Sequence, residues 1–148
     1  MELHEFLNTN KINILEESTE SLQRAQLKSY SASSADKNKE RLEKLFDFTL
    51  SCVQSKNLVG MTEYAEKIAK ERFDAGFDLH EVHTAFNVLE ETIWKKVVEN
   101  IEPSGLGKAL GLISTVLGAG KESLALTYVT LASKSKTKTL NLSELFGR

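Results

Sequence analysis

The most regular pattern of hydrophobic and polar positions in the chain lies between Leu79 and Ile101. Apolar residues recur there at every third or fourth position, and mostly polar or charged residues stand between them. This spacing puts the apolar side chains on one face of an α-helix. The pattern therefore predicts a long amphipathic helix whose apolar face consists of Leu79, Val82, Phe86, Leu89, Ile93, Val97 and Ile101.

A tight turn is predicted immediately before this helix. Gly76 has no Cβ and readily adopts the left-handed backbone conformation that ends many helices. Asp78 stands at the N-cap position, and Glu81 follows at the spacing of a capping box. Phe77 and Val82 occupy the two positions of a hydrophobic staple on either side of that cap. These residues predict two helices that fold back on each other.

Three helices are predicted before the turn, over Leu3–Leu27, about Asp36–Lys56 and about Val59–Ala75. Each has apolar residues at helical spacing and a polar opposite face. The run Asn8–Asn10 is expected to break or kink the first helix, because short polar side chains compete for backbone hydrogen bonds. The serine-rich segment Tyr30–Ser34 shows no apolar period and is predicted to be a connector.

The last helix is predicted over roughly Leu106–Ser133, after Pro103 has interrupted the preceding one. Its apolar residues lie on most sides, which is typical of a helix enclosed by its neighbours. Each of its glycines costs about 1 kcal/mol of helix propensity relative to alanine, and a close helix contact would offset that cost. We therefore expect this helix at the centre of a bundle or in a subunit interface; its glycines are Gly107, Gly111, Gly118 and Gly120.

The segment Lys134–Arg148 alternates lysine with serine and threonine before several leucines. We interpret it as a frayed end, a linker or a short docking segment. The chain then divides into a helical domain of residues 1–133 and a tail of residues 134–148. The expected fold is an all-α bundle of about five helices.

Composition and charge indicate which binding partners and which cell compartment to expect. The formal net charge of −2 gives no global electrostatic attraction to nucleic acid or to an anionic membrane. Cys52 is the only cysteine, which fits a reducing cytoplasm, and its place on an apolar helix face predicts burial. The N-terminus lacks the layout of a secretion signal. The uncharged apolar run Ala109–Gly120 is shorter than the roughly 20 residues that cross a bilayer, so we expect no membrane contact.

Two histidines on the long helix are the first candidates for chemistry. His80 and His83 are three positions apart, but the zinc-protease signature requires one residue more between its histidines. We therefore predict no metal site. The pair His80-Glu81 resembles the phosphoacceptor sequence of histidine kinases, but the usual continuation is missing. His83 is also the candidate proximal ligand in a haem-globin interpretation.

Two further features have structural explanations. The sequence Gly118-Ala119-Gly120-Lys121 lacks the first glycine and the Ser or Thr that a phosphate-binding loop requires. Trp94 is the only tryptophan, and burial explains it as well as a ligand contact does. We therefore count Trp94 among the structural residues, with Gly76, Phe77, Asp78, Glu81, Val82 and Phe86, and predict no catalytic residue.

The segment Gly76–Phe86, GFDLHEVHTAF, resembles the N-terminal regulatory domain of the RsbT co-antagonist (RsbR/RsbRD-like) proteins of bacterial stress signalling. Members typically show a glycine, an aromatic residue, a small or acidic cap, Leu and Glu-Val, followed by Ala and Leu with an aromatic residue at helical spacing. The opening residues from Phe6 to Leu15 are similar to the first helix of that family, and Ser18 stands where members often have an aromatic residue. The resemblance covers roughly residues 3–131.

This resemblance implies a helical sensory or scaffolding domain without catalytic residues, whose bundle is similar to a globin-like arrangement without haem. Such domains precede an output module, for example an anti-anti-sigma (STAS) domain, a histidine kinase or a transcription factor. We therefore expect a cytoplasmic, non-enzymatic signalling domain without a cofactor. It would form a homodimer and pass a change in helix packing to a partner or output domain. The alternatives are a sensor that binds haem or a small ligand through His83 and, third, a histidine phosphotransfer protein.

Overall fold

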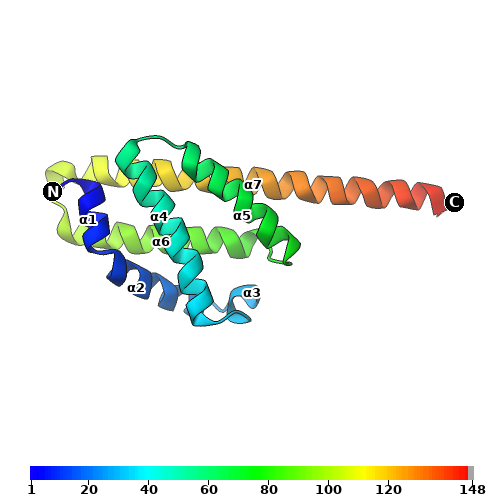
Figure 1. The fold of residues 1–148 in the computed structure, drawn as a ribbon, viewed down its shortest axis with the longest axis horizontal. Coiled ribbons are helices and arrows are strands. Elements are labelled where there is room, and N and C mark those ends of the chain that lie inside the picture. Colours follow the sequence, from blue (N-terminus) through cyan, green and yellow to red (C-terminus); the bar gives the residue numbers. More distant parts are fainter. Residues whose placement is uncertain (147–148) are drawn as a thin grey trace.

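The structure is a computed structural model that describes the backbone of residues 1–146 and the side chains of residues 1–135. Residues 1–146 contain no strand, so the predicted all-α helical bundle is confirmed. The helices in chain order are α1 (Leu3–Thr9), α2 (Lys11–Arg24), α3 (Lys28–Ser31), α4 (Ala35–Ser55), α5 (Val59–Asp74), α6 (Leu79–Asn100) and α7 (Pro103–Phe146) (Figure 1).

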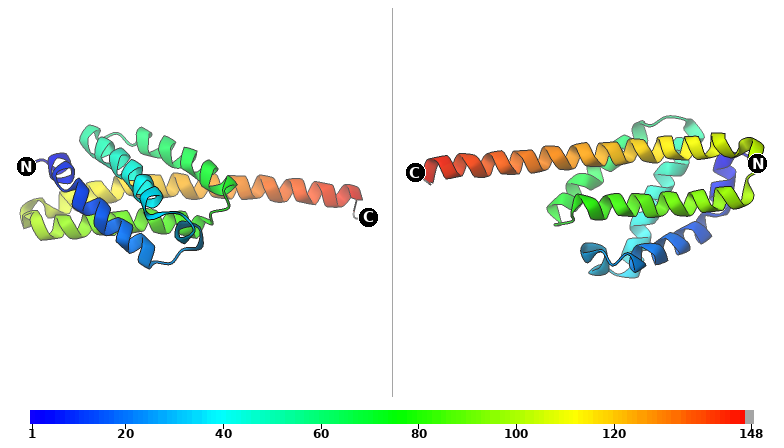
Figure 2. Two further views of the ribbon diagram at one scale, coloured as in Figure 1. Left: turned by 60° about the horizontal axis from the view of Figure 1, so that its bottom comes forward. Right: turned by 180° about the vertical axis from the view of Figure 1, so that it is seen from behind.

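Helix α7 forms one long side of the bundle. It packs along α5 and α6, and α2 packs against α6 and α4. Helices α6 and α7 lie side by side and run in opposite directions (Figures 1 and 2). The C-terminal part of α7 extends beyond the other helices in all the views. One end of α7 is therefore anchored in the bundle, and the other end projects from it.

One apolar core holds the helices together. Its deeply buried side chains come from α1, α2, α4, α5, α6 and α7, and include Leu7, Ile14, Leu22, Phe46, Met61, Phe86, Leu89, Ile93, Ile113 and Leu117. Cys52 is 3% exposed, as its place on the apolar face of α4 predicted. The core faces of α4, α5 and α6 are thus the faces that the hydrophobic spacing indicated.

The N-terminal segment forms two helices in place of the single helix expected over Leu3–Leu27. The break lies at Asn10, whose Nδ2 donates a hydrogen bond to the carbonyl oxygen of Phe6 at 2.9 Å. This break confirms the expectation at Asn8–Asn10. Helix α2 then ends at Arg24, earlier than expected.

The segment Tyr30–Ser34 is not the plain connector that we predicted. Its first residues belong to the short helix α3, and Tyr30 is 2% exposed. Asn38 of α4 is also buried, and its Nδ2 donates to the carbonyl oxygen of Tyr30 at 2.8 Å. A single helical turn is too short to show an apolar period, which explains why the pattern missed this core residue.

The turn between α5 and α6 has the predicted geometry. Gly76 has φ of 86°, in the left-handed region. The amide of Gly76 donates to the carbonyl of Phe73 at 3.1 Å, and the amide of Phe77 donates to that of Arg72 at 2.9 Å, which together form a Schellman motif. Asp78 is the N-cap of α6, and it forms the capping box with Glu81. Helix α5 therefore ends, and α6 begins, within a few residues.

Helix α7 differs from the predicted last helix at both ends. It begins at Pro103, because a proline in the first turn lacks only an amide that would have no partner in the helix. It continues through Phe146 and does not end at Ser133. No glycine or proline follows Gly120 until after Phe146, so nothing in the local sequence stops the helix.

Helix α7 is buried along one side only in the single chain. Ile113, Leu117 and Leu124 on the side facing the bundle are fully buried. Leu126 and Val129 are 61% and 59% exposed. The expectation of a fully enclosed helix is therefore wrong for one chain, and the alternative of a subunit interface stays a prediction.

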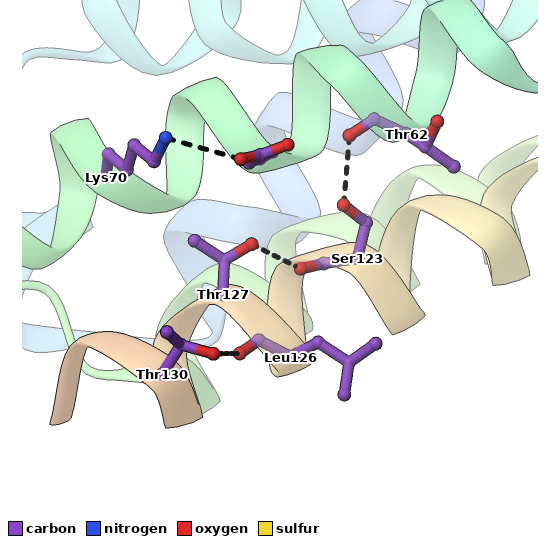
Figure 3. A network of polar contacts seen from close by, with 7 residues as sticks. Thr62, Lys70, Ser123, Leu126, Thr127 and Thr130 are labelled. Carbon is purple, nitrogen blue, oxygen red and sulfur yellow. Dashed lines mark hydrogen bonds and ion pairs between the residues drawn. The ribbon is translucent and has the colours of Figure 1, made fainter. Parts of the chain in front are cut away.

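The contact between α5 and α7 is close at Gly120. A Cβ added to Gly120 would lie 2.8 Å from Sδ of Met61 and 3.0 Å from Cε2 of Phe86. Ser123, one turn further along α7, donates from Oγ to the carbonyl oxygen of Thr62 at 2.9 Å (Figure 3). At this position glycine offsets its low helix propensity by allowing the backbones to approach.

Helix α7 also passes a simple test for membrane-spanning helices. Over Pro103–Ser135 it is long and apolar enough to cross a bilayer by length and composition alone. The core helices of water-soluble proteins can have the same length and composition. The expectation of no membrane contact stays a prediction.

Alanine substitutions at two glycines of α7 are expected to have different effects. At concentrations where the chain is a monomer, Gly111→Ala should raise the free energy of unfolding by about 0.5–1 kcal/mol, because alanine favours helix and nothing in the single chain lies within 4 Å of the added Cβ. Gly120→Ala should be less stable than Gly111→Ala by about 1–3 kcal/mol, because Met61 must move. Urea denaturation measures both values. Equal gains at the two positions would contradict the close contact at Gly120.

Candidate functional site

The carboxylate of Glu81 holds the corner between α5 and α6 to helix α3. Its Oε1 accepts from the amide of Ser29 at 2.6 Å, and its Oε2 accepts from Oγ of Ser29 at 2.8 Å and from the amide of Asp78 at 2.9 Å. Glu81 is only 5% exposed. Burial alone would raise the pKa of Glu81, but these hydrogen bonds, with Lys28 nearby, outweigh burial and lower the pKa below its ordinary value.

Phe77 packs against Tyr30 at this corner. The two rings meet edge to face, with centroids 5.1 Å apart and an angle of 87° between their planes. Both side chains are buried. Helix α3 and the corner are therefore joined by an aromatic contact as well as by the Glu81 carboxylate.

Tyr128 joins the same corner to α7. Its hydroxyl donates a hydrogen bond to the carbonyl oxygen of Phe77 at 2.8 Å. Its ring meets that of Phe73, the penultimate residue of α5, at a centroid distance of 5.6 Å. Burial raises the pKa of Tyr128 to about 12, so the hydroxyl stays protonated and able to donate at neutral pH.

A groove of about 680 Å³ lies between α4 and α5, and Phe77 belongs to its lining. Aromatic and aliphatic side chains form part of its wall. Phe48 and Tyr64 stack with ring centroids 4.4 Å apart and planes 16° apart, and Ile68 lies in the same wall. Burial raises the pKa of Tyr64 to about 12. The groove has the size of a small-molecule site, which is typically about 300–1,000 Å³.

Two arginines of the groove converge on Phe77. Cζ of Arg41 lies 5.1 Å from the centroid of the Phe77 ring, and Cζ of Arg72 lies 5.8 Å from it. Arg41 also donates from one nitrogen to Oγ of Ser33 at 2.9 Å and to Oδ1 of Asn38 at 3.0 Å. Both guanidinium groups therefore rest on an aromatic face, where cation–π attraction favours them.

The two guanidinium groups are not neutralised by a carboxylate nearby. Among residues 1–135, neither Arg41 nor Arg72 forms an ion pair within 4.0 Å. Arg72 donates to the hydroxyl oxygen of Tyr30 at 3.4 Å, which is a long hydrogen bond. Burial, and then the charge of Arg72, lower the pKa of Arg41. The arrangement thus places two cations close together in a partly buried position.

The fold brings together only some of the residues that we predicted from the sequence to be structural. Gly76, Phe77, Asp78, Glu81 and Val82 form the corner, where Phe77 and Val82 are both buried as a staple requires. Phe86 lies in the core beneath α7 and is 1% exposed. Trp94 is 40% exposed, so burial does not account for the only tryptophan.

The histidines lie outside the groove. His80 is exposed, and His83 is partly buried beside Asn87, with 3.2 Å between Nδ1 of His83 and Nδ2 of Asn87. Burial and the nearby charge of Lys121 lower the pKa of His83. Among the described residues, no group of three or more His, Cys, Asp or Glu side chains is placed to hold a metal ion.

Sequence reasoning missed the residues that line the groove. We expected the face of α4 rich in lysine and glutamate to meet water and did not consider Arg41. Arg41 is next to Leu42 of the apolar stripe, and its guanidinium group lies over Phe77. Tyr64 and Arg72 of α5 also escaped notice, because helical spacing shows which face is apolar but not what a neighbouring helix brings to its edge. The presence of arginines next to the stripe was the only available signal.

Comparison with known proteins adds no relative: no protein-family model, curated protein or solved structure matches this chain. The resemblance to the regulatory domain of RsbT co-antagonist proteins therefore rests on the residues alone.

Proposed function

We propose that this protein is a non-catalytic signalling domain in which a conformational change in the α4–α5 groove is transmitted to α7 through Phe77. The observation that carries the proposal is the double role of Phe77. Its ring lies under Arg41 and Arg72 in the groove, and its carbonyl oxygen accepts the hydrogen bond of Tyr128 in α7. A shift of Phe77 that includes its backbone would thus move a buried hydrogen bond of the projecting helix.

The packing of α7 supports a role as the transmitting element. It contacts both α5 and α6, and the buried contact at Gly120 leaves little free space between the backbones. Closely packed interfaces respond to a local change by moving between discrete arrangements. At about 1.5 Å per residue, a helix of 44 residues is about 66 Å long, so it would carry such a change out of the bundle.

The composition of the groove supports binding more than catalysis. Its lining includes cationic and aromatic side chains but no serine, cysteine or histidine among the described residues. A nucleophile beside a general base is the usual basis of covalent catalysis. We therefore propose a binding or regulatory domain and no enzyme activity.

The alternatives have less support. None of the four described hollows of the structure is lined by His83, which is the proposed haem ligand. His80 is exposed, as a phosphoacceptor must be, but no second observation favours phosphotransfer. We therefore propose a signalling sensor. Among its alternatives, we favour a sensor that binds a small ligand over a haem sensor or a phosphotransfer protein.

Reciprocal substitutions test the connection between the groove and α7. Removal of the Tyr128 hydroxyl in Tyr128→Phe should shift the amide NMR resonances of Arg41, Tyr64 and Arg72, and Arg72→Gln should shift those around Tyr128, because coupling between two sites acts in both directions. The control is Thr127→Val, whose Oγ1 bonds only within α7, to the carbonyl of Ser123. Shifts confined to the helix that carries each substitution would contradict the proposal.

We further propose that the outer face of α7, formed by Gly107, Gly111, Gly118, Leu126 and Val129, pairs with a second copy of this chain. Nothing lies within 4 Å of a Cβ added at the three glycines, and both apolar side chains are exposed. Exposed apolar surface of this kind often marks an interface. A two-fold contact of one face with itself is the commonest form of homodimer.

The dimer can be tested by sedimentation velocity at high micromolar concentration. The wild type should sediment with twice the chain mass of 16.5 kDa. Gly118→Arg should be a folded monomer, because the new side chain has room in one chain but not in a close helix pair. Gln23→Arg, on the exposed side of α2, should remain dimeric. A monomeric wild type, or a dimeric Gly118→Arg, would refute this interface.

A further inference from the structure

The side chains that line the α4–α5 groove have a positive net charge, whereas the net charge of the whole chain is negative. Five cationic side chains line it, against three acidic ones, whereas the formal net charge of the chain is −2. The cationic residues are Lys37, Arg41, Lys44, Lys67 and Arg72. One of these, Lys44, is paired with Glu40 at 3.7 Å. The remaining excess of positive charge makes the groove attractive to anions.

The part of the groove beside Phe77 offers hydrogen-bond donors for such an anion. A guanidinium group presents several N–H donors in a planar fork that matches a carboxylate or a phosphate. Arg72 uses one of them in the long contact with Tyr30, and Arg41 uses one nitrogen for Ser33 and Asn38. The other N–H donors of Arg41 and Arg72 have no protein acceptor among residues 1–135. Both guanidinium groups lie over aromatic rings, and these contacts favour their positions in the groove.

We propose that this groove binds a small organic anion, in which a carboxylate or phosphate group meets Arg41 and Arg72 and a planar apolar body lies against Tyr64 and Ile68. The inference deepens the proposed function, because such an anion would be the signal that the domain senses. Binding of the anion would relieve the repulsion between the two guanidinium groups. It would also press on Phe77, which both of them contact.

The apolar body follows from the shape and composition of the wall. The stacked rings of Phe48 and Tyr64 lie along the same groove as the two arginines, and Phe48 is 37% exposed. A volume of about 680 Å³ exceeds what a free inorganic ion fills. Tyr64 and Ile68 are buried beside it, at 8% and 5% exposure. An anion with an aromatic body would cover the exposed part of Phe48 and the small accessible areas of these two residues, and inorganic phosphate would not.

Titration of the isotope-labelled full chain with naphthoate, followed by NMR, tests the inference. The expected result is saturable shifts at Arg41, Tyr64 and Arg72 with a Kd of about 0.1–1 mM, the range reached by a ligand of this size. Neutral naphthamide and inorganic phosphate should each bind at least about tenfold more weakly, because each lacks one of the two contacts. Naphthyl phosphate is the second probe. Saturable binding of either aromatic anion in the groove supports the inference, and the one that binds more strongly identifies the preferred anionic group.

Substitutions of the two arginines test whether naphthoate binds in the groove. Arg41→Gln and Arg72→Gln should each weaken naphthoate binding roughly tenfold or more, because charge-assisted hydrogen bonds are lost. Lys95→Gln, on the exposed face of α6, should bind as the wild type does. If a variant is poorly folded, the shift map of the wild type still decides whether the groove is the site.

Three outcomes would overturn the inference: no saturable shifts in the groove, equal affinity for naphthamide, or equal affinity for inorganic phosphate. Failure of the proposed function gives a different result. If naphthoate saturates the groove but leaves the resonances around Tyr128 unchanged, the anion site stands and the connection to α7 fails.

Discussion

The buried carboxylate of Glu81 is the interaction on which the arrangement of this protein depends. It accepts two hydrogen bonds from Ser29 of α3 and one from Asp78 at the start of α6. A buried carboxylate is costly unless such donors surround it, and here it has three. The carboxylate therefore does more than cap α6. It holds α3 against the corner, and α3 in turn places Tyr30 beside Phe77.

Around this corner, the groove and the projecting helix share one residue. The ring of Phe77 supports two guanidinium groups that no carboxylate neutralises within residues 1–135, and its carbonyl oxygen accepts the hydroxyl of Tyr128. The two arginines of the groove and Tyr128 of α7 thus contact a single buried residue, the arginines at its ring and Tyr128 at its backbone carbonyl. This connection, rather than a catalytic group, is what makes a signalling role the best-supported proposal.

The sequence predicted what local chemistry determines, and it failed where the answer depends on distant elements. The corner between α5 and α6 was predicted from Gly76, Asp78 and Glu81, because helix caps and left-handed turns are determined by neighbouring residues. The same Glu81 also binds Ser29, 52 positions away, and no local pattern shows that contact. Helix α7 was expected to be enclosed because its apolar residues lie on most sides, whereas in one chain only the side facing α5 and α6 is buried. The groove was missed since Arg41 and Arg72 come from two helices that meet only in the fold.

The most direct test of the account is the pH dependence of the stability of Glu81→Gln relative to the wild type. The folded-state pKa of Glu81 lies below its ordinary value of 4.5, so its stabilisation is complete above about pH 4.5 and is lost as pH falls through the folded pKa. We predict that Glu81→Gln is less stable by about 1.5–3 kcal/mol near neutral pH, and that the difference shrinks below about pH 4.5. The control Glu91→Gln, on the exposed face of α6, should show little difference at any pH. A Glu81→Gln variant as stable as the wild type at neutral pH, or a difference that does not change with pH, would contradict the central role of this carboxylate.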